Sequence, residues 1–359
     1  MTGGRRIEAL TGLRGVAALV VLAFHLRAIG GPADDLAGER GYLAVHLFFV
    51  LSGYVMCHAH FAEYAQGAFS YARFIGLRLG RIWPAHLAVL GLWLLAIAAA
   101  SLAGIPFNAD SEHGLGAYVL AYATMVHAWG MYAVHDFNPP SWSVSAEWFA
   151  YLLFPLFATA VRPLRGPAAI AVAAGALLAA SFAVLLSLDA PAMAYDRLVL
   201  ARTALGFALG CLMWRLAQAR PPARLSAWAG DAAALGIVLL AFIAPPADAI
   251  DFLYLALFAL LVFGLGEERG LVARALASPP MRFLGEISYS LYLIHWLAMG
   301  ASVKLWTLAF GPPQGGWTLV VAAIATIVSL VASTALYRLV EAPARQAVRR
   351  FLARQRAPA

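Results

Sequence analysis

Two ionisable side chains, Arg14 and His25, interrupt the first apolar segment of the chain, residues 11–25. They are eleven residues apart, which in an α-helix puts them on one face, separated by about 16 Å along the axis. Charged side chains inside a membrane span face a bundle interior or a watery cavity, and they mark functional sites by default. The alternative is a snorkelling Arg14 near the membrane surface and a hydrogen-bonded His25 that only packs.

A second group of cations, Arg73, Arg78 and Arg81, lies in the segment RFIGLRLGRIWP. Arg78 and Arg81 are three residues apart and would share a helical face. Such a cluster can hold a phosphate-bearing ligand through charge-assisted, bidentate hydrogen bonds. The alternative is a topology determinant beside anionic lipid headgroups. We expect this stretch to be cytoplasmic and to lead into Pro84 at the start of the next span.

The segment PPSWSVSAEWFAYLLFP places Ser141, Trp142, Ser143 and Glu147 in the first turns of a predicted span. Ser143 and Glu147 are i, i+4 neighbours, and an unpaired carboxylate at this depth would be costly. A buried Glu147 could orient a histidine or bind sugar hydroxyls, and tryptophan faces suit a sugar ring. The alternative is an interfacial aromatic belt with a capping serine. That alternative leaves the carboxylate unexplained.

Near the C-terminus, the segment GEISYSLYLIHW puts Ser288, Tyr292 and His295 on one stripe of an apolar span. Their i, i+4, i+7 spacing aligns them along one helical face. Each residue alone is explained by hydrogen-bonded packing. Three in register favour a lined cavity.

Two further polar residues have structural explanations. Ser52, beside Gly53, interrupts bulky residues, and small residues in membrane helices most often permit close helix packing; a close approach of the backbone to a ligand is the alternative. Glu341 closes the last predicted span, and we expect it to pair with nearby arginines. The basic helix after it is expected on the membrane surface.

The composition indicates a polytopic membrane protein. The chain has 359 residues, of which 63% are hydrophobic and 12% charged, and its mean hydropathy is +0.78. The net charge of +7 comes from arginines in short segments between apolar runs. That arrangement is typical of positive-inside topology and not of a nucleic-acid surface. Neither Cys57 nor Cys211 has metal-ligand spacing, and no metal site or cleavable signal peptide is evident.

The sequence predicts an all-α polytopic membrane protein with about ten transmembrane helices around a polar cavity. A single membrane domain covers residues 1–359, with spans between about 10 and 340 and a cytoplasmic basic tail at 341–359. Runs long enough to span are at 10–29, 41–60, 83–104, 141–161, 167–188, 198–216, 228–246, 252–266, 283–303 and 317–340. If the run at 114–134 does not cross the membrane, the basic connections between spans lie on one side of the membrane and the acidic connections lie on the other. We therefore predict that 114–134 is re-entrant or interfacial and that both termini are cytoplasmic.

Taken together, five segments give the chain a family resemblance. LTGLRGVAALVVLAFH, FFVLSGY, RLGRIWP, SWSVSAEWFAY and SYSLYLIHW occur in order between about residues 7 and 345. Each is short, but the set resembles the acyltransferase type 3 family of multi-span membrane acyltransferases. The resemblance covers essentially the whole chain.

The resemblance implies transfer of an acyl group, commonly acetyl from acetyl-CoA, to a hydroxyl of a carbohydrate, glycoconjugate or macrolide. By matching motifs, His25 is the expected catalytic histidine and Arg14 its partner. Arg78 and Arg81 are expected to engage the CoA phosphates. The hypothesis makes neutral His25 a general base, oriented by Glu147 or another polar group. An acyl-histidine intermediate stays open.

The remaining assignments follow from this hypothesis. Arg14, Arg73 and Ser52 join Arg78 and Arg81 as donor-binding residues; the residues assigned to the acceptor are Ser141, Trp142, Ser143, Tyr292 and His295. The partners expected are acyl-CoA, a glycan acceptor and lipids of the bacterial inner membrane, with no metal and no nucleic acid. The oligomeric state stays open, a homo-oligomer included.

Two other functions fit a multi-span bundle with polar residues in a cavity. A transporter or flippase of a lipid-linked glycan would bind its substrate without thioester chemistry, but such proteins often have repeated halves, which this sequence lacks. A membrane sensor or scaffold would use Arg14 and His25 only to pair helices. In a scaffold, substituting either residue would impair folding and not catalysis.

Overall fold

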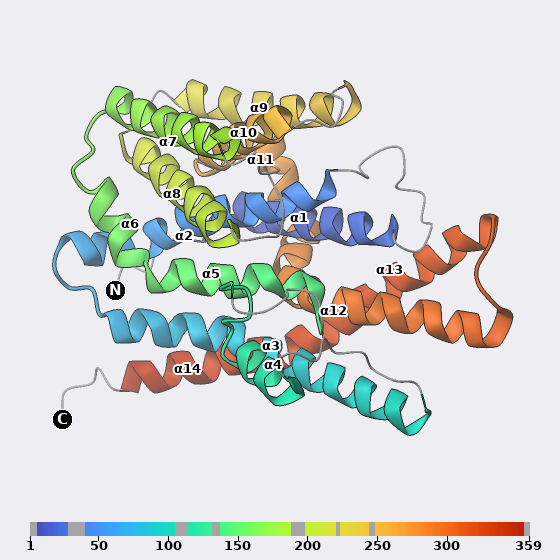
Figure 1. The fold of residues 1–359 in the computed structure, drawn as a ribbon. Coiled ribbons are helices and arrows are strands. Elements are labelled where there is room, and N and C mark those ends of the chain that lie inside the picture. Colours follow the sequence, from blue (N-terminus) through green and yellow to red (C-terminus); the bar gives the residue numbers. More distant parts are fainter. Residues whose placement is uncertain are drawn as a thin grey trace. The chain divides into compact units, whose positions relative to one another are not determined.

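The computed structural model of the chain describes residues 6–27, 40–104, 114–130, 137–187, 198–219, 223–243 and 248–354 (Figure 1). Every regular element in these ranges is helical, so the predicted all-α class is confirmed. The α-helices are α1 (Glu8–Leu26), α2 (Ala44–Ala65), α3 (Tyr71–Leu102), α4 (Gly114–Ala123), α5 (Trp142–Leu152), α6 (Phe154–Val161), α7 (Pro167–Ser187), α8 (Val199–Gln218), α9 (Ala223–Ile243), α10 (Asp248–Leu265), α11 (Leu271–Leu276), α12 (Pro279–Phe310), α13 (Gly316–Leu336) and α14 (Ala342–Arg354). Shorter helical pieces are η3 (Gly41–Leu43), η4 (Pro139–Ser141) and the π-helical turn η5 (Tyr337–Glu341).

The helices match the predicted spans well. Among the described residues, eight helices are long and apolar enough to cross a membrane, and the bent pair α5–α6 would make nine. The remaining predicted span, 252–266, corresponds to α10, whose apolar part, Ile250–Leu265, is shorter than the eight candidate spans. Helix α4 has ten residues and is about 15 Å long, half the hydrocarbon thickness of about 30 Å. This length agrees with the prediction that 114–134 does not cross.

The start of α3 differs from the prediction. Pro84 was expected to begin this span, but α3 begins at Tyr71 and contains Pro84 in its interior. Ser70 caps the early start, because its Oγ accepts the backbone N–H of Arg73 at 3.4 Å. The basic stretch is therefore the first part of a long helix and not a connection before it.

The predicted span 141–161 is not one straight helix. It consists of α5 and α6, which meet at a bend of 58°. Pro155, at the start of α6, has no backbone N–H to donate to the preceding turn, and its ring disfavours a straight continuation.

Only part of the acidic connections that were predicted to share one side of the membrane lies within the described residues. Asp251, expected in a connection, is instead buried within α10, where it accepts a hydrogen bond from Tyr42 Oη at 2.6 Å. Arg40 Nε lies 3.6 Å from the same carboxylate. The other acidic side chains used for the orientation lie outside the described residues: Asp34, Asp35, Glu39, Asp110, Glu112, Asp189, Asp196 and the side chain of Asp248.

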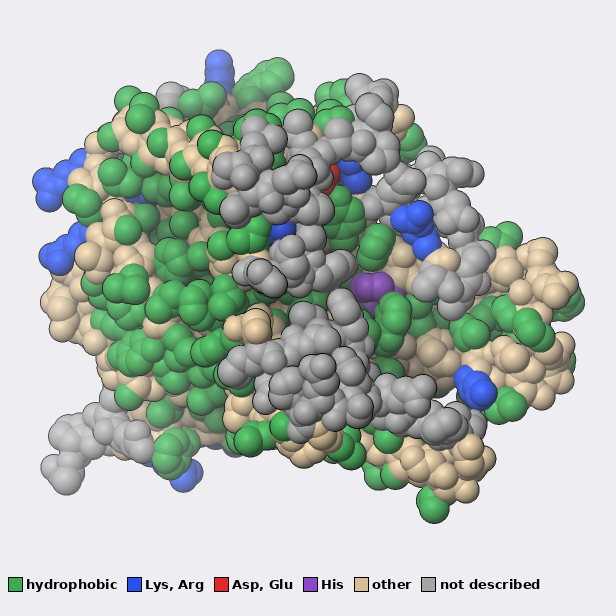
Figure 2. Space-filling model, viewed as in Figure 1, with side chains coloured by type: hydrophobic (Ala, Val, Ile, Leu, Met, Phe, Trp, Pro, Cys, Tyr) green, Lys and Arg blue, Asp and Glu red, His purple; other side chains and the backbone are tan. Residues whose placement is uncertain are grey.

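Outward-facing side chains are apolar on many helices. Leu95, Leu102, Val172 and Leu308 are 68%, 90%, 71% and 72% exposed. On the face shown in Figure 2, hydrophobic side chains dominate the described surface, and Lys and Arg are few. Soluble proteins rarely expose contiguous apolar patches of this kind. These helices, together with the composition, identify an integral membrane protein.

Contacts divide the chain into two compact units, and the prediction of a single membrane domain stays a prediction. The first unit comprises Met1–Phe24, Ala33–Phe69 and Leu152–Glu286. Within it, α2 and α8 pack side by side, and a Cβ at Gly53 would overlap the carbonyl oxygen of Phe207. Gly53 is therefore a close-packing position, as the sequence predicted for the Ser52–Gly53 pair.

We expect Gly53→Ala to lower the thermal unfolding temperature of the protein. The added methyl group overlaps the Phe207 carbonyl, and overpacking of this kind costs about 1–3 kcal/mol. The control is Gly175→Ala in α7, where the added Cβ meets no atom within 4 Å. Alanine is favoured over glycine in helices by up to about 1 kcal/mol, so the control is expected to be at least as stable as the parent. Equal unfolding temperatures for the two variants in detergent would contradict the packing argument.

The second unit comprises His25–Pro32, Ser70–Tyr151 and Ile287–Ala359. The first half of α3 and helix α14 lie side by side within it (Figure 1). A Cβ on Gly76 would lie 3.3 Å from Leu352, and one on Gly80 would lie 2.7 Å from Val348. These two glycines, four residues apart, let α14 approach the α3 backbone closely.

Candidate active site

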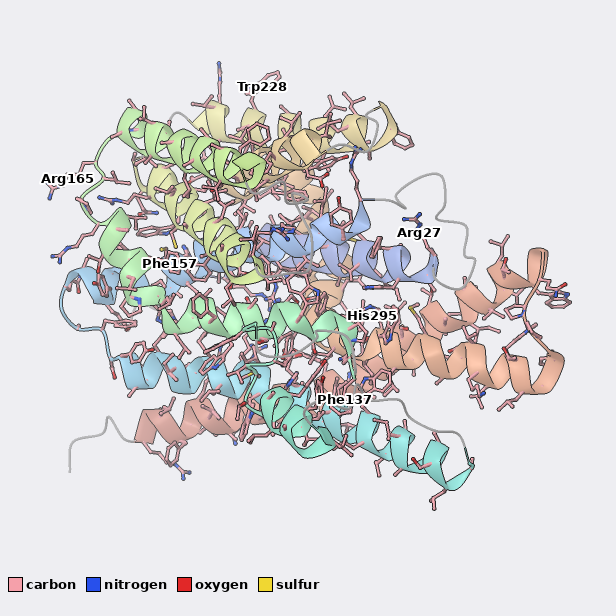
Figure 3. The ribbon with its side chains drawn as sticks, in the orientation of Figure 1. Arg27, Phe137, Phe157, Arg165, Trp228 and His295 are labelled. Atoms are coloured by element: carbon pink, nitrogen blue, oxygen red, sulfur yellow. The ribbon has the colours of Figure 1, made fainter. Side chains whose placement is uncertain are left out.

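His25, in the last turn of α1, contacts a second histidine within the second unit. Its Nδ1 lies 2.9 Å from Nε2 of His295 on α12 (Figure 3, where His295 is labelled). The ring of Trp296 stands edge-on to His25, with 5.0 Å between the ring centroids. Arg14 and His25 both lie in α1, as predicted. The structure therefore brings together His25 and a residue that the sequence had assigned to the acceptor.

The hydrogen bonds of His295 determine which ring nitrogens carry protons. Its Nδ1 lies 2.8 Å from the carbonyl oxygen of Tyr292 and 3.1 Å from that of Leu291. Because a carbonyl oxygen only accepts, Nδ1 of His295 is the donor. His295 is 1% exposed, and a charged ring there would be costly. Nε2 of a neutral His295 then accepts the proton of His25 Nδ1, which leaves the lone pair of His25 on Nε2.

Hydrogen bonds join the part of α12 that carries His295 to the turn before α5 and to the first turn of α5. Tyr292 Oη donates to the carbonyl oxygen of Pro140 at 2.8 Å and accepts a hydrogen bond from Ser143 Oγ at 2.7 Å. Asn138 Nδ2 donates to the carbonyl oxygen of Leu293 at 2.9 Å. Ser143 and Tyr292, both assigned to acceptor binding from two different predicted spans, are thus brought together. Their contacts hold the helical turn whose carbonyl oxygens orient His295.

A second buried network also involves this turn. Ser141 Oγ donates to the carbonyl oxygen of Asn138 at 2.8 Å and lies 3.1 Å from Nε2 of His127. The ring of Tyr122 stacks on His127 at 3.9 Å between centroids. Burial, with a smaller contribution from the neighbouring His86, lowers the pKa of His127 to about 3. His127, in the turn after α4, is therefore neutral at pH 7 and supports the Pro139–Ser143 segment.

Glu147 is hydrogen-bonded within α5. Tyr151 Oη donates to its Oε1 at 2.6 Å, and Arg78 lies over the Tyr151 ring at 5.9 Å. His295, whose Nε2 lies 2.9 Å from His25 Nδ1, is a polar group that can orient the His25 imidazole. A catalytic role for Glu147 stays a prediction.

The other predicted site residues divide between the two units. Arg14 and Ser52 belong to the first unit, with Arg14 half-buried in α1 and Ser52 buried in α2. Arg73, Arg81 and Trp142 belong to the second unit, with Trp142 buried at the start of α5.

Sequence reasoning gave little weight to three residues that the structure places in these networks. None of His127, Asn138 and Trp296 was assigned a role from the sequence. Their only sequence signal was their position: Asn138 directly precedes Pro139-Pro140, and Trp296 directly follows His295.

No group of three or more His, Cys, Asp or Glu side chains among the described residues has the arrangement of a metal site. The polar contacts described here are hydrogen bonds among histidine, hydroxyl, amide and carbonyl groups. Such an arrangement can deprotonate a hydroxyl at His25 Nε2.

Comparison with known proteins shows the family of the chain. The family model described as "Acyltransferase domain" matches residues 7–338. The chain is 29% identical to acyltransferase MdmB of Streptomyces mycarofaciens, covering 94% of this chain and 91% of that protein. It is 28% identical to a putative membrane-bound transacylase, BcsY, of Komagataeibacter xylinus, over 91% of this chain and 81% of that one.

A third relative is longer than this chain. It is a putative peptidoglycan O-acetyltransferase, YrhL, of Bacillus subtilis (strain 168), with 26% identity over 95% of this chain and 55% of that protein. No solved structure matches the chain.

Proposed function

Because the chain belongs to the acyltransferase type 3 family, we propose that it transfers an acetyl group from acetyl-CoA to a carbohydrate hydroxyl, with His25 as general base. The names of the relatives support this reaction class: an acyltransferase, a putative membrane-bound transacylase and a putative peptidoglycan O-acetyltransferase. A carbohydrate or glycoconjugate acceptor fits the last of these names.

The observation that carries the proposal is the hydrogen bond between His25 Nδ1 and His295 Nε2, 2.9 Å long. It holds the lone pair of His25 on Nε2, where the base must receive a proton. His295 thus has the orienting role that a carboxylate has in a serine protease triad. Because His295 is neutral, it orients the ring without placing a full charge in the apolar interior.

The reaction follows in two proton movements. His25 Nε2 takes the proton of the acceptor hydroxyl while the hydroxyl oxygen attacks the thioester carbonyl carbon. The carbon–sulfur bond then breaks, and the thiolate of CoA leaves with its bonding electron pair. The imidazolium of His25 returns its proton to that thiolate, which gives the O-acetyl ester, CoA thiol and neutral His25.

The donor and acceptor are assigned to different residues. Arg78 and Arg81 of the second unit would hold the donor phosphates, with Arg73 of the same unit beside them in sequence; for Arg14 and Ser52, which belong to the first unit, donor binding stays a prediction. The segment Ser141–Ser143 with Tyr292 would shape the acceptor site, where Trp142 supplies an apolar face. Basic connections on one side favour a bacterial inner-membrane protein with cytoplasmic termini, so acetyl-CoA would enter from the cytoplasm.

The proposal is tested by donor turnover of the purified chain in detergent. Acetyl-CoA is supplied with peptidoglycan fragments and other glycans, and CoA thiol release is measured beside the mass of the acetylated acceptor. We expect thiol release that depends on an acceptor. Absence of both CoA binding and turnover in folded protein would overturn the enzyme hypothesis and make a glycan transporter the leading alternative.

We expect Arg14→Ala to raise the KM for acetyl-CoA by about 10- to 100-fold, since hydrogen bonds to charged groups contribute about 1.5–3 kcal/mol. Initial-rate kinetics measures the change. Arg162→Ala, an exposed arginine that follows α6, is the matched control and should leave KM unchanged. Unfolding of Arg14→Ala, with normal kinetics in its folded fraction, would indicate the scaffold role instead.

A further inference from the structure

A buried carboxylate joins three helices at one end of the second unit. Glu341 ends the π-helical turn η5 and its side chain is fully buried. Its Oε2 accepts a hydrogen bond from Ser290 Oγ of α12 at 2.9 Å. Its Oε1 lies 3.6 Å from Nη1 of Arg345 on α14 and 4.0 Å from Nη1 of Arg81 on α3. The predicted pairing of Glu341 with nearby arginines is confirmed, and it joins α14 to the basic part of α3.

The π-helical turn has a local cause in the sequence. Pro343 follows two residues after Glu341, and its ring would clash with the carbonyl group four residues earlier in a regular helix. A wider turn relieves that clash, and such turns often occur at functional sites.

Two arginines of α14 lie on the helix face that packs against α3. Arg345, Val348, Arg349 and Leu352 are spaced i, i+3, i+4 and i+7, which aligns them on one face. Val348 and Leu352 are the residues that contact the glycines of α3. Arg345 and Arg349 are therefore directed along the same interface, whereas Arg350 is rotated by about 100° from Arg349.

The interface holds more positive than negative charge. Arg81 and Arg349 lie close enough to Arg78 to repel it, and Arg81 and Arg349 repel Arg345 in the same way. Glu341 and Glu147 are the carboxylates that act on these arginines. Among these described residues, four guanidinium groups face two carboxylates, which leaves an excess of two positive charges. Arg81 and Arg345 are 18% and 28% exposed, so this excess is accessible to a ligand.

We propose that Arg345 and Arg349 of α14 complete a phosphate-binding site with Arg78 and Arg81, and that this site binds the phosphate groups of the acyl-CoA donor. The inference rests on the proposed function for the identity of the donor. Guanidinium groups bind phosphate oxygens through paired, charge-assisted hydrogen bonds. A ligand with several phosphates, as in CoA, matches a cluster of several arginines. Glu341 holds Arg81 and Arg345 in place before the ligand arrives.

The test compares acetyl-CoA with a shorter donor that lacks its phosphates and its adenosine. Acetyl-CoA carries a diphosphate and a ribose phosphate, whereas acetyl-pantetheine has neither. We measure kcat/KM for both donors with the full-length protein and with Arg345→Gln, Arg349→Gln and the control Arg350→Gln. The ratio of acetyl-CoA to acetyl-pantetheine efficiency is expected to fall by about 10- to 100-fold in the first two variants, the range for losing a charge-assisted bond. It should stay unchanged in the control.

Three further outcomes separate this proposal from its alternatives. An unchanged ratio in folded Arg345→Gln and Arg349→Gln would overturn it. Each variant is also assayed in nanodiscs of phosphatidylcholine alone and with phosphatidylglycerol; an effect confined to the anionic discs would assign the cluster to lipid headgroups and overturn the donor assignment. If the parent protein turns over no acetyl-CoA, binding of inorganic pyrophosphate that is lost in the Arg345→Gln/Arg349→Gln double variant still supports the phosphate site, while the proposed function fails.

Discussion

His25→Ala is expected to reduce acetyl transfer by about 10²- to 10⁴-fold, the contribution typical of a positioned general base. The side chain lies at the C-terminal end of α1, and its removal deletes the proton acceptor of the reaction. The acetyl-CoA dissociation constant should change little, because His25 is not among the proposed donor-binding residues. Thiol release with saturating acceptor measures the loss, and thermal unfolding is followed in parallel.

The control for this variant is His58→Ala in α2, a partly exposed histidine of the first unit. It should retain parental turnover. A folded His25→Ala protein with parental turnover would exclude a general base at this position. An inactive, unfolded His25→Ala protein beside a stable His58→Ala protein would instead favour the scaffold hypothesis.

His295 is expected to affect turnover through the tautomer of His25. His295→Leu removes the acceptor for the His25 Nδ1 proton, so the ring is no longer held with its lone pair on Nε2. Loss of the orienting group in a serine protease triad lowers kcat by about 10⁴-fold, and we expect a fall of about 10²-fold or more here. His295→Gln places a carbonyl oxygen near the position of Nε2 and should retain more activity than His295→Leu.

The distinguishing measurement is the order of kcat among the variants at constant donor affinity. A positioning role predicts the order parent, His295→Gln, His295→Leu, with donor dissociation constants that stay within about twofold. Equal loss in both variants together with lower unfolding temperatures would show that His295 contributes only to packing. A fall in acceptor affinity without a fall in kcat would support its original assignment to acceptor binding.

Several properties of this chain are local and could be predicted from residue order. Hydropathy over windows of about twenty residues located the helices, because the bilayer thickness sets the length of a span. The eleven-residue spacing of Arg14 and His25 put both on one helix, and the i, i+3 spacing of Arg78 and Arg81 put both in one cluster. These predictions depend only on the period of the α-helix.

Helix boundaries were less accurate where local chemistry competes with hydropathy. Apolar character alone placed the start of the third span at Pro84, but α3 begins at Tyr71, because a polar, arginine-bearing segment can still be helical when Ser70 caps it. The run 141–161 reads as one span, yet Pro155 bends it. Hydropathy reports burial in lipid and carries no information on caps or kinks.

The sequence by itself determined the membrane class, the family and the polar faces on which the site is built. Only the tertiary structure decided that His295 contacts His25, that Tyr292 and Ser143 join α12 to α5, and that Glu341 lies beside Arg81 of α3. Periodicity shows which residues share a face, but not the partner to which that face turns. That partner depends on contacts between segments more than a hundred residues apart, whose energies no local pattern encodes.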